Sequence, residues 1–168
     1  MSPLPDPHTL LKKITQETRT FLDRHHINDP HMVGIHTGGS WVAQALHQAL
    51  SLKQELGTLD ISFYRDDYTR IGLNPQVKPS HLPFVVEDRD ILLVDDVLHT
   101  GRTIRAALNE LFDYGRPRSI HLIVLLDRSG RELPIQADVS GQHLSLRPDQ
   151  HIKLQGPEPL QFIFSEDC

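Results

Sequence analysis

Two apolar runs constrain the fold of this chain more than any other feature of its sequence. Ile91 to Val94 reads "ILLV", and Ser119 to Leu126 reads "SIHLIVLL". Strands that are apolar on both faces are typical of a parallel sheet that helices cover on both sides. Parallel neighbours also need long crossover connections, which are usually helices. The runs therefore predict an α/β fold with a parallel core sheet flanked by helices.

The segments around these runs supply the helices that such a sheet requires. Their apolar residues recur either at helical spacing or in the alternation of a strand. The predicted helices are Asp6 to His26, Trp41 to Leu50 with Ser40 as its cap, and Ile104 to Tyr114. Further strands are predicted at Met32 to Ile35 and across the alternating residues Leu59, Ile61 and Phe63.

Length and composition fit one domain, predicted to span residues 1–168. The chain has a net charge of −5, no apolar stretch long enough to cross a membrane, and a single cysteine, Cys168. A lone cysteine allows no internal disulfide, so a cytoplasmic location is expected. The negative charge disfavours a wholly basic nucleic-acid binder, and the scattered histidines lack the spacing of metal ligands.

Two adjacent carboxylates, Asp95 and Asp96, end the first apolar run, and "HTGRT" follows shortly after. Ligands of parallel sheets bind beyond the carboxyl ends of the strands, so this turn and the "HTGGS" turn after Ile35 are expected to share one crevice. Helix-initial N–H groups and the hydroxyl groups of Thr100 and Thr103 suit a phosphate. The carboxylates suit sugar hydroxyl groups or the water ligands of Mg²⁺. The predicted ligand is a phosphorylated sugar.

Each of these features alone also has a plain structural explanation. An acidic pair after a strand commonly forms a turn and caps a helix, and Thr-Gly-Gly is often a simple tight turn. A long aperiodic segment is often a passive loop. Their joint occurrence, in this order on an alternating fold, favours a functional site.

The run "ILLVDDVLHTGRT" resembles the phosphoribosyl-pyrophosphate signature of the type I phosphoribosyltransferases. "VGIHTGG", "GTLDISFYRDD", "DDVLHTGRTIRAALNELFDYGRP" and "LLDRSGRELPIQAD" are similar, in the same order, to landmarks of the PyrR family within that class. Members of that family are bifunctional: they attenuate pyrimidine operons and transfer phosphoribose to uracil. The resemblance implies the type I phosphoribosyltransferase fold.

The resemblance also implies roles for individual residues. Asp95 and Asp96 would be catalytic acids that hold the ribose hydroxyl groups, and Arg65 would neutralise the pyrophosphate. The residues expected to contact phosphoribosyl pyrophosphate or nucleotide are Thr37, Gly38, Gly39, Val94, Asp95, Asp96, Val97, Leu98, His99, Thr100, Gly101, Arg102 and Thr103. Asp127, Arg128 and Val139 are expected to contact the base. Mg²⁺ is expected near the two acids, held through water and substrate, with no direct protein ligand.

Two segments are expected to cover this site. Residues 66–83 hold three Pro, one Gly and no periodicity, and a loop this long is usually functional or disordered. The resemblance implies that it closes over the site and excludes water. Residues 127–168 are expected to form the hood that reads the base, an irregular cap with small strands.

The chain departs from the PyrR pattern in two places. His99 stands where that family usually has Tyr, and His36-Thr37-Gly38-Gly39 stands where it commonly has Lys-Thr-Arg-Gly. A charge-assisted contact is worth on the order of 1.5–3 kcal/mol. Losing such contacts to the leaving group implies transfer that is roughly 10–100-fold slower.

The resemblance therefore implies an enzyme and a regulator in one chain. The enzyme would form uridine monophosphate (UMP) and diphosphate from uracil and phosphoribosyl pyrophosphate. The regulator would bind the pyr messenger RNA leader in response to UMP or UTP, as a homodimer or higher homo-oligomer whose copies add their basic residues. The alternatives are salvage of uracil or a purine base without RNA binding, and a nucleotide sensor with vestigial catalysis.

Overall fold

The computed structural model describes residues 3–61 and 80–167. Its helices are α1 (Pro7–Arg24), α2 (Gly38–Leu50) and α4 (Arg102–Tyr114). Its strands are β1 (His31–Ile35), β2 (Gly57–Leu59), β3 (Asp90–Leu98), β4 (Ser119–Arg128), β5 (Val139–Leu144), β6 (Gln150–Gln155) and β7 (Gln161–Glu166). No helix in these two ranges has the length and apolar character that a membrane crossing requires.

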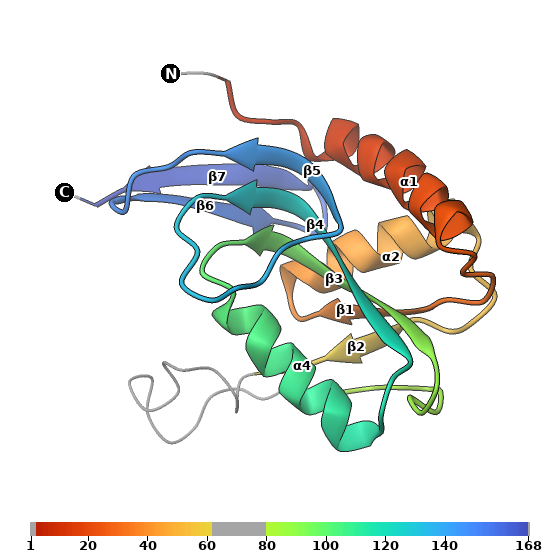
Figure 1. Ribbon diagram of the computed structural model, residues 1–168. Helices are drawn as coiled ribbons and strands as arrows, with labels where there is room; N and C mark the ends of the chain where they lie inside the picture. Colours follow the sequence, from red (N-terminus) through yellow and green to blue (C-terminus); the bar gives the residue numbers. More distant parts are fainter. Residues whose placement is uncertain (1–2, 62–79, 168) are drawn as a thin grey trace.

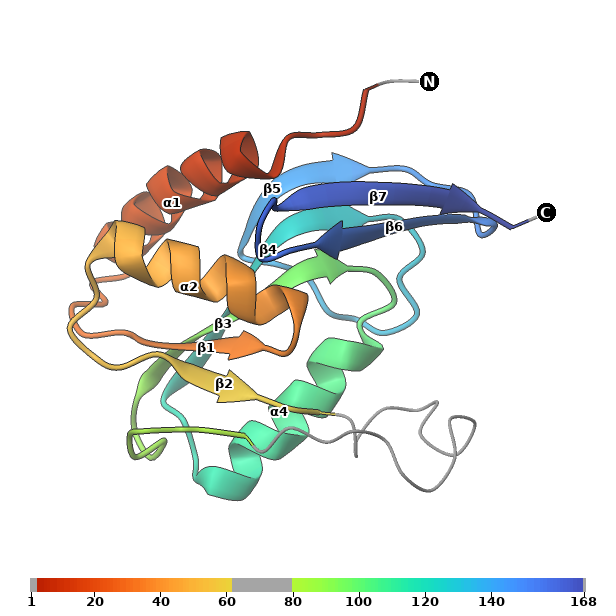
Figure 2. The same cartoon turned by 180° about the vertical axis from the view of Figure 1, so that it is seen from behind.

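A five-stranded sheet forms the centre of the molecule, in the order β2-β1-β3-β4-β5. All four pairings within it are parallel. Helices α1 and α2 cover one face and α4 covers the other, as the two opposite views show (Figures 1 and 2). This confirms the α/β architecture that the apolar runs predict.

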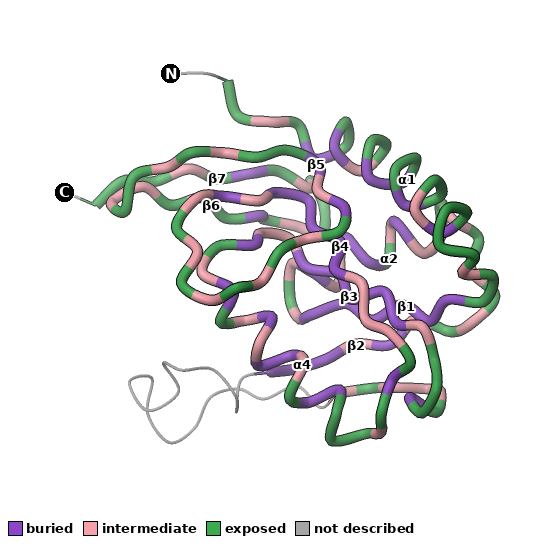
Figure 3. Tube along the Cα trace, viewed as in Figure 1, coloured by how far each residue is buried: buried purple, intermediate pink, exposed green. Residues whose placement is uncertain are grey.

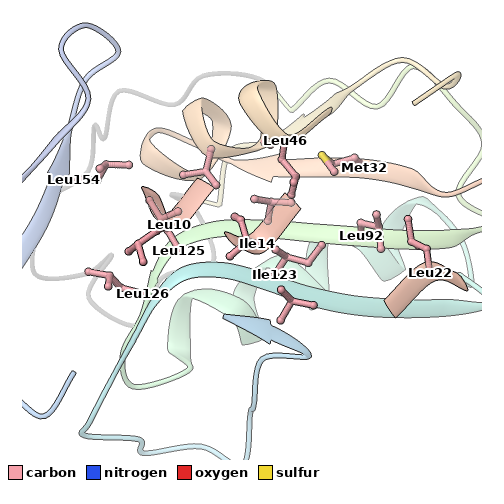
Figure 4. Packing of buried hydrophobic residues seen from close by; sticks show 14 of the residues in the cluster. Leu10, Ile14, Leu22, Met32, Leu46, Leu92, Ile123, Leu125, Leu126 and Leu154 are labelled. Atoms are coloured by element: carbon pink, nitrogen blue, oxygen red, sulfur yellow. The ribbon is translucent and has the colours of Figure 1, made fainter. Parts of the chain in front are cut away.

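Strand β3 shows why those runs are apolar throughout. Leu92 and Val94 belong to the core cluster beneath α1 and α2, whereas Ile91 and Leu93 belong to the cluster beneath α4. Both faces of the strand are therefore covered, and buried residues concentrate on the central strands (Figure 3). Figure 4 shows side chains from the two helices meeting those of the strands in the first of these clusters.

Two elements near the expected site have different ends from those predicted. β3 continues to Leu98 and does not end at Val94, because β4 keeps pairing with it that far. α2 begins at Gly38, with Thr37 in place of Ser40 as its N-cap residue. Apolar periodicity cannot locate these ends, because acids interrupt the first pattern and glycines precede the second.

The small strands predicted for the C-terminal segment are present, and they are arranged more regularly than an irregular cap. β5 joins the core sheet beside β4, and β6 and β7 form an antiparallel hairpin. Leu154 and Phe162 of the hairpin are buried in the core cluster beneath α1 and α2. The sequence "VSGQHL" does not predict β5 clearly, because an edge strand with exposed residues contains few apolar residues.

Arg128, the last residue of β4, joins the hairpin to the sheet. Its side chain is only 4% exposed, and it donates from Nη1 to the carbonyl of Gln150 at 3.0 Å and from Nη2 to that of Arg147 at 3.4 Å. Burial lowers the pKa of this guanidinium. Its ordinary value is so high that the group stays charged at neutral pH. A buried cation therefore holds the turn that leads into the hairpin.

Glu110 links α4 to residues beside β2. The Ser80 hydroxyl donates to Glu110 Oε1 and accepts the N–H of Asp60, the latter at 2.9 Å. Glu110 is 8% exposed, and its Oε2 is buried without a hydrogen-bond partner in the described part of the chain. Burial raises the pKa of Glu110, the hydrogen bond from Ser80 partly opposes this, and the neighbouring charges of Asp60 and Asp113 reinforce it.

The substitution Glu110→Gln should stabilise the fold at neutral and alkaline pH. Because the pKa of the folded state lies above the unfolded value, the neutral carboxyl contributes stability below the unfolded pKa, and this is lost as pH rises through the folded pKa. An amide does not ionise, so the variant should not show this loss. Thermal melting between about pH 4 and pH 8 measures it, with the exposed substitution Glu55→Gln as the control. If the melting temperatures of wild type and Glu110→Gln change with pH in parallel, the expectation is contradicted.

The substitution Arg128→Met should destabilise the protein, because it removes both donors to the hairpin carbonyl groups. Both hydrogen bonds are part-buried, and a hydrogen bond to a charged group contributes about 1.5–3 kcal/mol. The matched control is Arg147→Met, because Arg147 pairs with Asp149 and Glu166 on the surface, where ion pairs contribute about 0–1 kcal/mol. Urea unfolding compares the two variants. If Arg128→Met lowers the free energy of unfolding no more than Arg147→Met does, the buried cation does not hold the hairpin.

Candidate functional site

The connections of the central strands diverge between β1 and β3. β1 leads through α2 to β2, and β3 leads through α4 to β4, on the opposite face of the sheet and in the opposite direction. Ligands of open parallel sheets bind where connections diverge in this way, beyond the carboxyl ends of the strands. The turns before α2 and α4 both lie at this edge, beside the β6–β7 hairpin (Figure 1). The structure thus brings the "HTGGS" and "DDVLHTGRT" segments together.

Asp95 and Asp96 lie where β3 continues past the end of its pairing with β1, which stops at Gly34 and Val94. Asp95 is 5% exposed, and its Oδ1 accepts the N–H of Asp96 at 2.9 Å. Asp96 is half-buried, and its Oδ1 accepts the N–H of Val97 at 2.8 Å. Each carboxylate is therefore oriented by the backbone of the following residue. Asp95 is more deeply buried than a residue at a free strand end would be.

The first turn of α2 lies directly against these acids. A Cβ atom on Gly39 would stand 2.8 Å from the carbonyl oxygen of Val94 and 2.9 Å from Asp95 Oδ1. A Cβ atom on Gly38 would stand 2.2 Å from Asp96 Oδ2. Real Cβ atoms essentially never approach other atoms within 3.0 Å. The paired glycines therefore allow the helix to reach the acidic pair.

The turn between β1 and α2 contains a cis peptide bond, between His36 and Thr37. The N–H of His36 donates to the carbonyl of Leu59 at 2.9 Å, and its ring Nδ1 lies 3.2 Å from Ser40 Oγ. Thr37 makes no side-chain capping hydrogen bond to the helix. A helix N-terminus without a side-chain cap is suited to an anion.

The second turn is built on a glycine in the left-handed region, Gly101, with φ of 95°. α4 begins at the next residue, Arg102, two residues before the predicted start at Ile104. The hydroxyl of Thr100 accepts the N–H of Arg102 at 3.2 Å. A side chain at position 101 would be strained in this conformation. The glycine therefore lets the chain turn from β3 into the start of α4, beside Thr103.

The hood segment holds this turn through its backbone. The carbonyl of Thr100 accepts the N–H groups of Glu132 and Leu133 at 2.9 and 3.1 Å. The side chain of Arg102 pairs with Glu132, with Nε and Oε1 3.1 Å apart. Arg131 donates to the carbonyl of His99. Sequence patterns do not reveal these contacts, because the partners lie far apart in the chain and no spacing marks them.

His99, the residue that departs from the family pattern, is packed against the hood. A Cβ atom on Gly130 would stand 2.8 Å from its Nε2. Burial lowers the pKa of His99, and the nearby charge of Arg128 lowers it further. The imidazole is therefore neutral at neutral pH. It brings no positive charge to the turn from Thr100 to Thr103, which is called the phosphate turn below after its expected ligand.

The three residues that are expected to contact the base lie in different surroundings. Asp127 lies beside the phosphate turn and pairs with Arg131, with Oδ1 and Nη2 2.7 Å apart. Arg128 is engaged with the hairpin, as described above. Val139 is 5% exposed and packs in the core cluster with Leu10. The expectation that Val139 contacts the base is corrected, because its side chain is part of the hydrophobic core.

The segment 66–83, which is expected to close over the site, lies largely outside the described residues, as does Arg65. Only residues 80–83 of the segment 66–83 are described. His81 exchanges two backbone hydrogen bonds with Thr58 of β2, each 2.8 Å long. The end of this segment is therefore fixed to the sheet edge and is not part of a free loop.

Among the described residues, the acidic pair is not part of a larger group of metal-ligating side chains. Within residues 3–61 and 80–167, no three His, Cys, Asp or Glu side chains gather in an arrangement that would hold a metal ion. A cation at these acids would therefore need water or substrate oxygens to complete its coordination.

Comparisons with known proteins agree with this geometry. The phosphoribosyl transferase domain model matches residues 8–158. The bifunctional protein PyrR of Pseudomonas paraeruginosa is 59% identical over 157 residues, which cover 94% of this chain and 92% of the relative. The bifunctional protein PyrR of Nitrosococcus oceani is 64% identical over 137 residues, which cover 80% of this chain and 77% of the relative.

Solved structures of hypoxanthine phosphoribosyltransferases share the fold. The enzyme from Staphylococcus aureus has a TM-score of 0.66 at 19% identity and covers 86% of this chain and 77% of its own. The enzyme from Trypanosoma cruzi has a TM-score of 0.66 at 22% identity, and the match covers 84% of this chain and 80% of the enzyme. These structures support the fold, and the much more similar relatives support the branch. The chain belongs to the phosphoribosyltransferase family and, within it, to the PyrR family of bifunctional proteins.

Proposed function

We propose that this protein is a uracil phosphoribosyltransferase that forms UMP and diphosphate from uracil and phosphoribosyl pyrophosphate. The observation that carries the proposal is the meeting of an acidic pair, a glycine turn and a second helix N-terminus at one point of divergence in the sheet. Membership of the PyrR family supports uracil as the acceptor base.

Each part of this site has a task in the reaction. The turn from Thr100 to Thr103 holds the 5′-phosphate, and Asp95 and Asp96 hold the ribose hydroxyl groups. The first turn of α2 holds the diphosphate. Uracil N1 then attacks C1′ of the ribose as the bond to diphosphate breaks. The acids stabilise positive charge on the sugar, so the catalysis is positioning and electrostatics, with no covalent intermediate.

The residues present fit a magnesium ion that is bound mainly through water and substrate. Mg²⁺ keeps several of its waters and prefers one or two carboxylates together with phosphate oxygens. Asp96 is half-exposed and Asp95 lies next to it, so both are suited to the water ligands of such an ion. When bound, the ion would neutralise the departing diphosphate.

The second proposed function is regulation of pyrimidine genes through binding of a leader RNA, with UMP or UTP as the signal. The PyrR family supports it. Several arginines in the described residues are paired with acids, among them Arg102 with Glu132, Arg118 with Asp90 and Arg131 with Asp127, so part of the positive charge of a single copy is neutralised. Binding would therefore depend on a homodimer or larger assembly that adds the remaining cations of its copies.

UMP formation from uracil and phosphoribosyl pyrophosphate is the direct test of the enzyme. Asp95→Asn and Asp96→Asn should each slow it roughly 10–100-fold, since a charge-assisted contact of about 1.5–3 kcal/mol to the sugar is lost. The control is Asp23→Asn, an exposed substitution at the far end of α1. Thermal melting must accompany the rates because Asp95 is buried. Wild-type rates in both site variants would reject the assignment of the acids.

Binding to the leader RNA of the cell's own pyrimidine operon tests the regulator. Affinity should fall steeply with salt, with a logarithmic slope close to the number of phosphates contacted. It should also change when UMP is added, because a sensor requires coupling between its nucleotide site and its RNA site. An unrelated stem-loop of equal length is the control. Equal affinity for both RNAs would leave the protein as an enzyme alone.

A further inference from the structure

The carboxylate of Asp96 occupies the space that a side chain at position 38 would need. A Cβ atom on Gly38 would stand 2.2 Å from Asp96 Oδ2, 2.8 Å from its Cγ and 3.3 Å from its Cβ. The other oxygen, Oδ1, accepts the N–H of Val97 at 2.8 Å. The carboxylate is therefore held between the backbone of β3 and the first residue of α2.

Conformation does not explain the glycine at this position. The left-handed glycines of the described chain are Gly101, Gly115 and Gly130, and Gly38 is not among them. Gly38 is the first residue of α2, where alanine is well tolerated. Outside its chain neighbours and the backbone of its own helix, the three atoms nearest to its missing Cβ all belong to the movable side chain of Asp96. What the glycine provides is room for that carboxylate.

Gly39 is under a different constraint. Its missing Cβ would meet the backbone of β3, at 2.8 Å from the Val94 carbonyl oxygen and 3.0 Å from the Asp95 Cα. These atoms cannot move without shifting the strand. Gly39 is therefore needed for the packing of α2 on β3, whereas a methyl group at position 38 would displace a single side chain.

The position of the Asp96 carboxylate has an electrostatic consequence. The N-terminus of a helix carries a partial positive charge, and α2 has no side-chain cap at Thr37. A carboxylate beside the first residue of the helix is stabilised by this charge, and it repels any other anion that approaches the N–H groups at this helix end. The diphosphate product is such an anion.

We propose that Gly38 is a positioning residue that lets the Asp96 carboxylate rest beside the N-terminus of α2, where it competes with diphosphate. This rests on the proposed function, which places diphosphate at this turn. Any larger residue at position 38 turns the carboxylate away from the helix. The resting position of Asp96 thus weakens diphosphate binding until ligand displaces the carboxylate.

A double-mutant cycle tests the competition. Calorimetric titration with inorganic diphosphate in metal-free buffer compares wild type, Gly38→Ala, Asp96→Ala and the double variant. Gly38→Ala should bind diphosphate about two- to fivefold more tightly, the range expected for one carboxylate near a helix N-terminus. Asp96→Ala should bind diphosphate more tightly than wild type, and at least as tightly as Gly38→Ala does. The double variant should bind diphosphate with the same affinity as Asp96→Ala alone, because the carboxylate that Gly38→Ala displaces is absent.

The control is Gln44→Ala, which changes an exposed residue of the same helix and should leave diphosphate affinity unchanged. Thermal melting should show that Gly38→Ala keeps the fold. Unchanged or weaker binding by Gly38→Ala, an equal effect with and without Asp96, or no binding by any of the four proteins overturns the proposal. If Gly38→Ala does not fold, Asp96→Ala must still bind more tightly, and unchanged binding by this variant overturns the proposal as well.

The titration needs neither uracil nor turnover, so its outcome is separate from that of the transferase assay. The predicted affinities without UMP formation would reject uracil transfer and keep the role of Gly38. UMP formation with unchanged affinities would keep the enzyme and reject the role of Gly38.

Discussion

The site depends on one constraint, the divergence of β1 from β3. Pairing between these strands stops at Val94, while β3 continues alongside β4 to Leu98. The place that β1 vacates is taken by the first turn of α2. Two carboxylates would be costly in the middle of a sheet covered on both faces. Here they lie at the edge of the covered region, with backbone N–H groups to hold them and a helix N-terminus beside them.

The hood is part of the same construction. Thr100 of the phosphate turn accepts two backbone hydrogen bonds from the hood, and Arg128 attaches the β6–β7 hairpin to the end of β4. The segments proposed to read the base and to bind phosphate are thus tied to neighbouring strands of one sheet. Such an arrangement positions two ligands relative to each other, which is the main requirement of a transfer reaction without a covalent intermediate.

Ionisable groups that folding removes partly or fully from water have different roles in the two halves of the fold. Burial favours the neutral forms of Glu110 beneath α4 and of His99 beside the hood. Arg128 stays charged because the ordinary pKa of a guanidinium is so high, and it donates to the carbonyl groups of Arg147 and Gln150. The positive charge near the phosphate turn is therefore smaller than the number of nearby basic residues suggests. Weak binding of anions and ready exchange of nucleotides would suit a protein that also senses them.

The sequence by itself determined the sheet and the type of site. Apolar runs such as Ile91 to Val94 can only be buried on both faces, and this requires parallel strands under helices. It also located the acids and both turns, because their chemistry is local. Only the tertiary structure decided that β3 continues to Leu98, that Val139 lies in the core, and that Gly38 makes room for Asp96. Those facts depend on contacts between residues that are distant in the chain, and no local pattern encodes them.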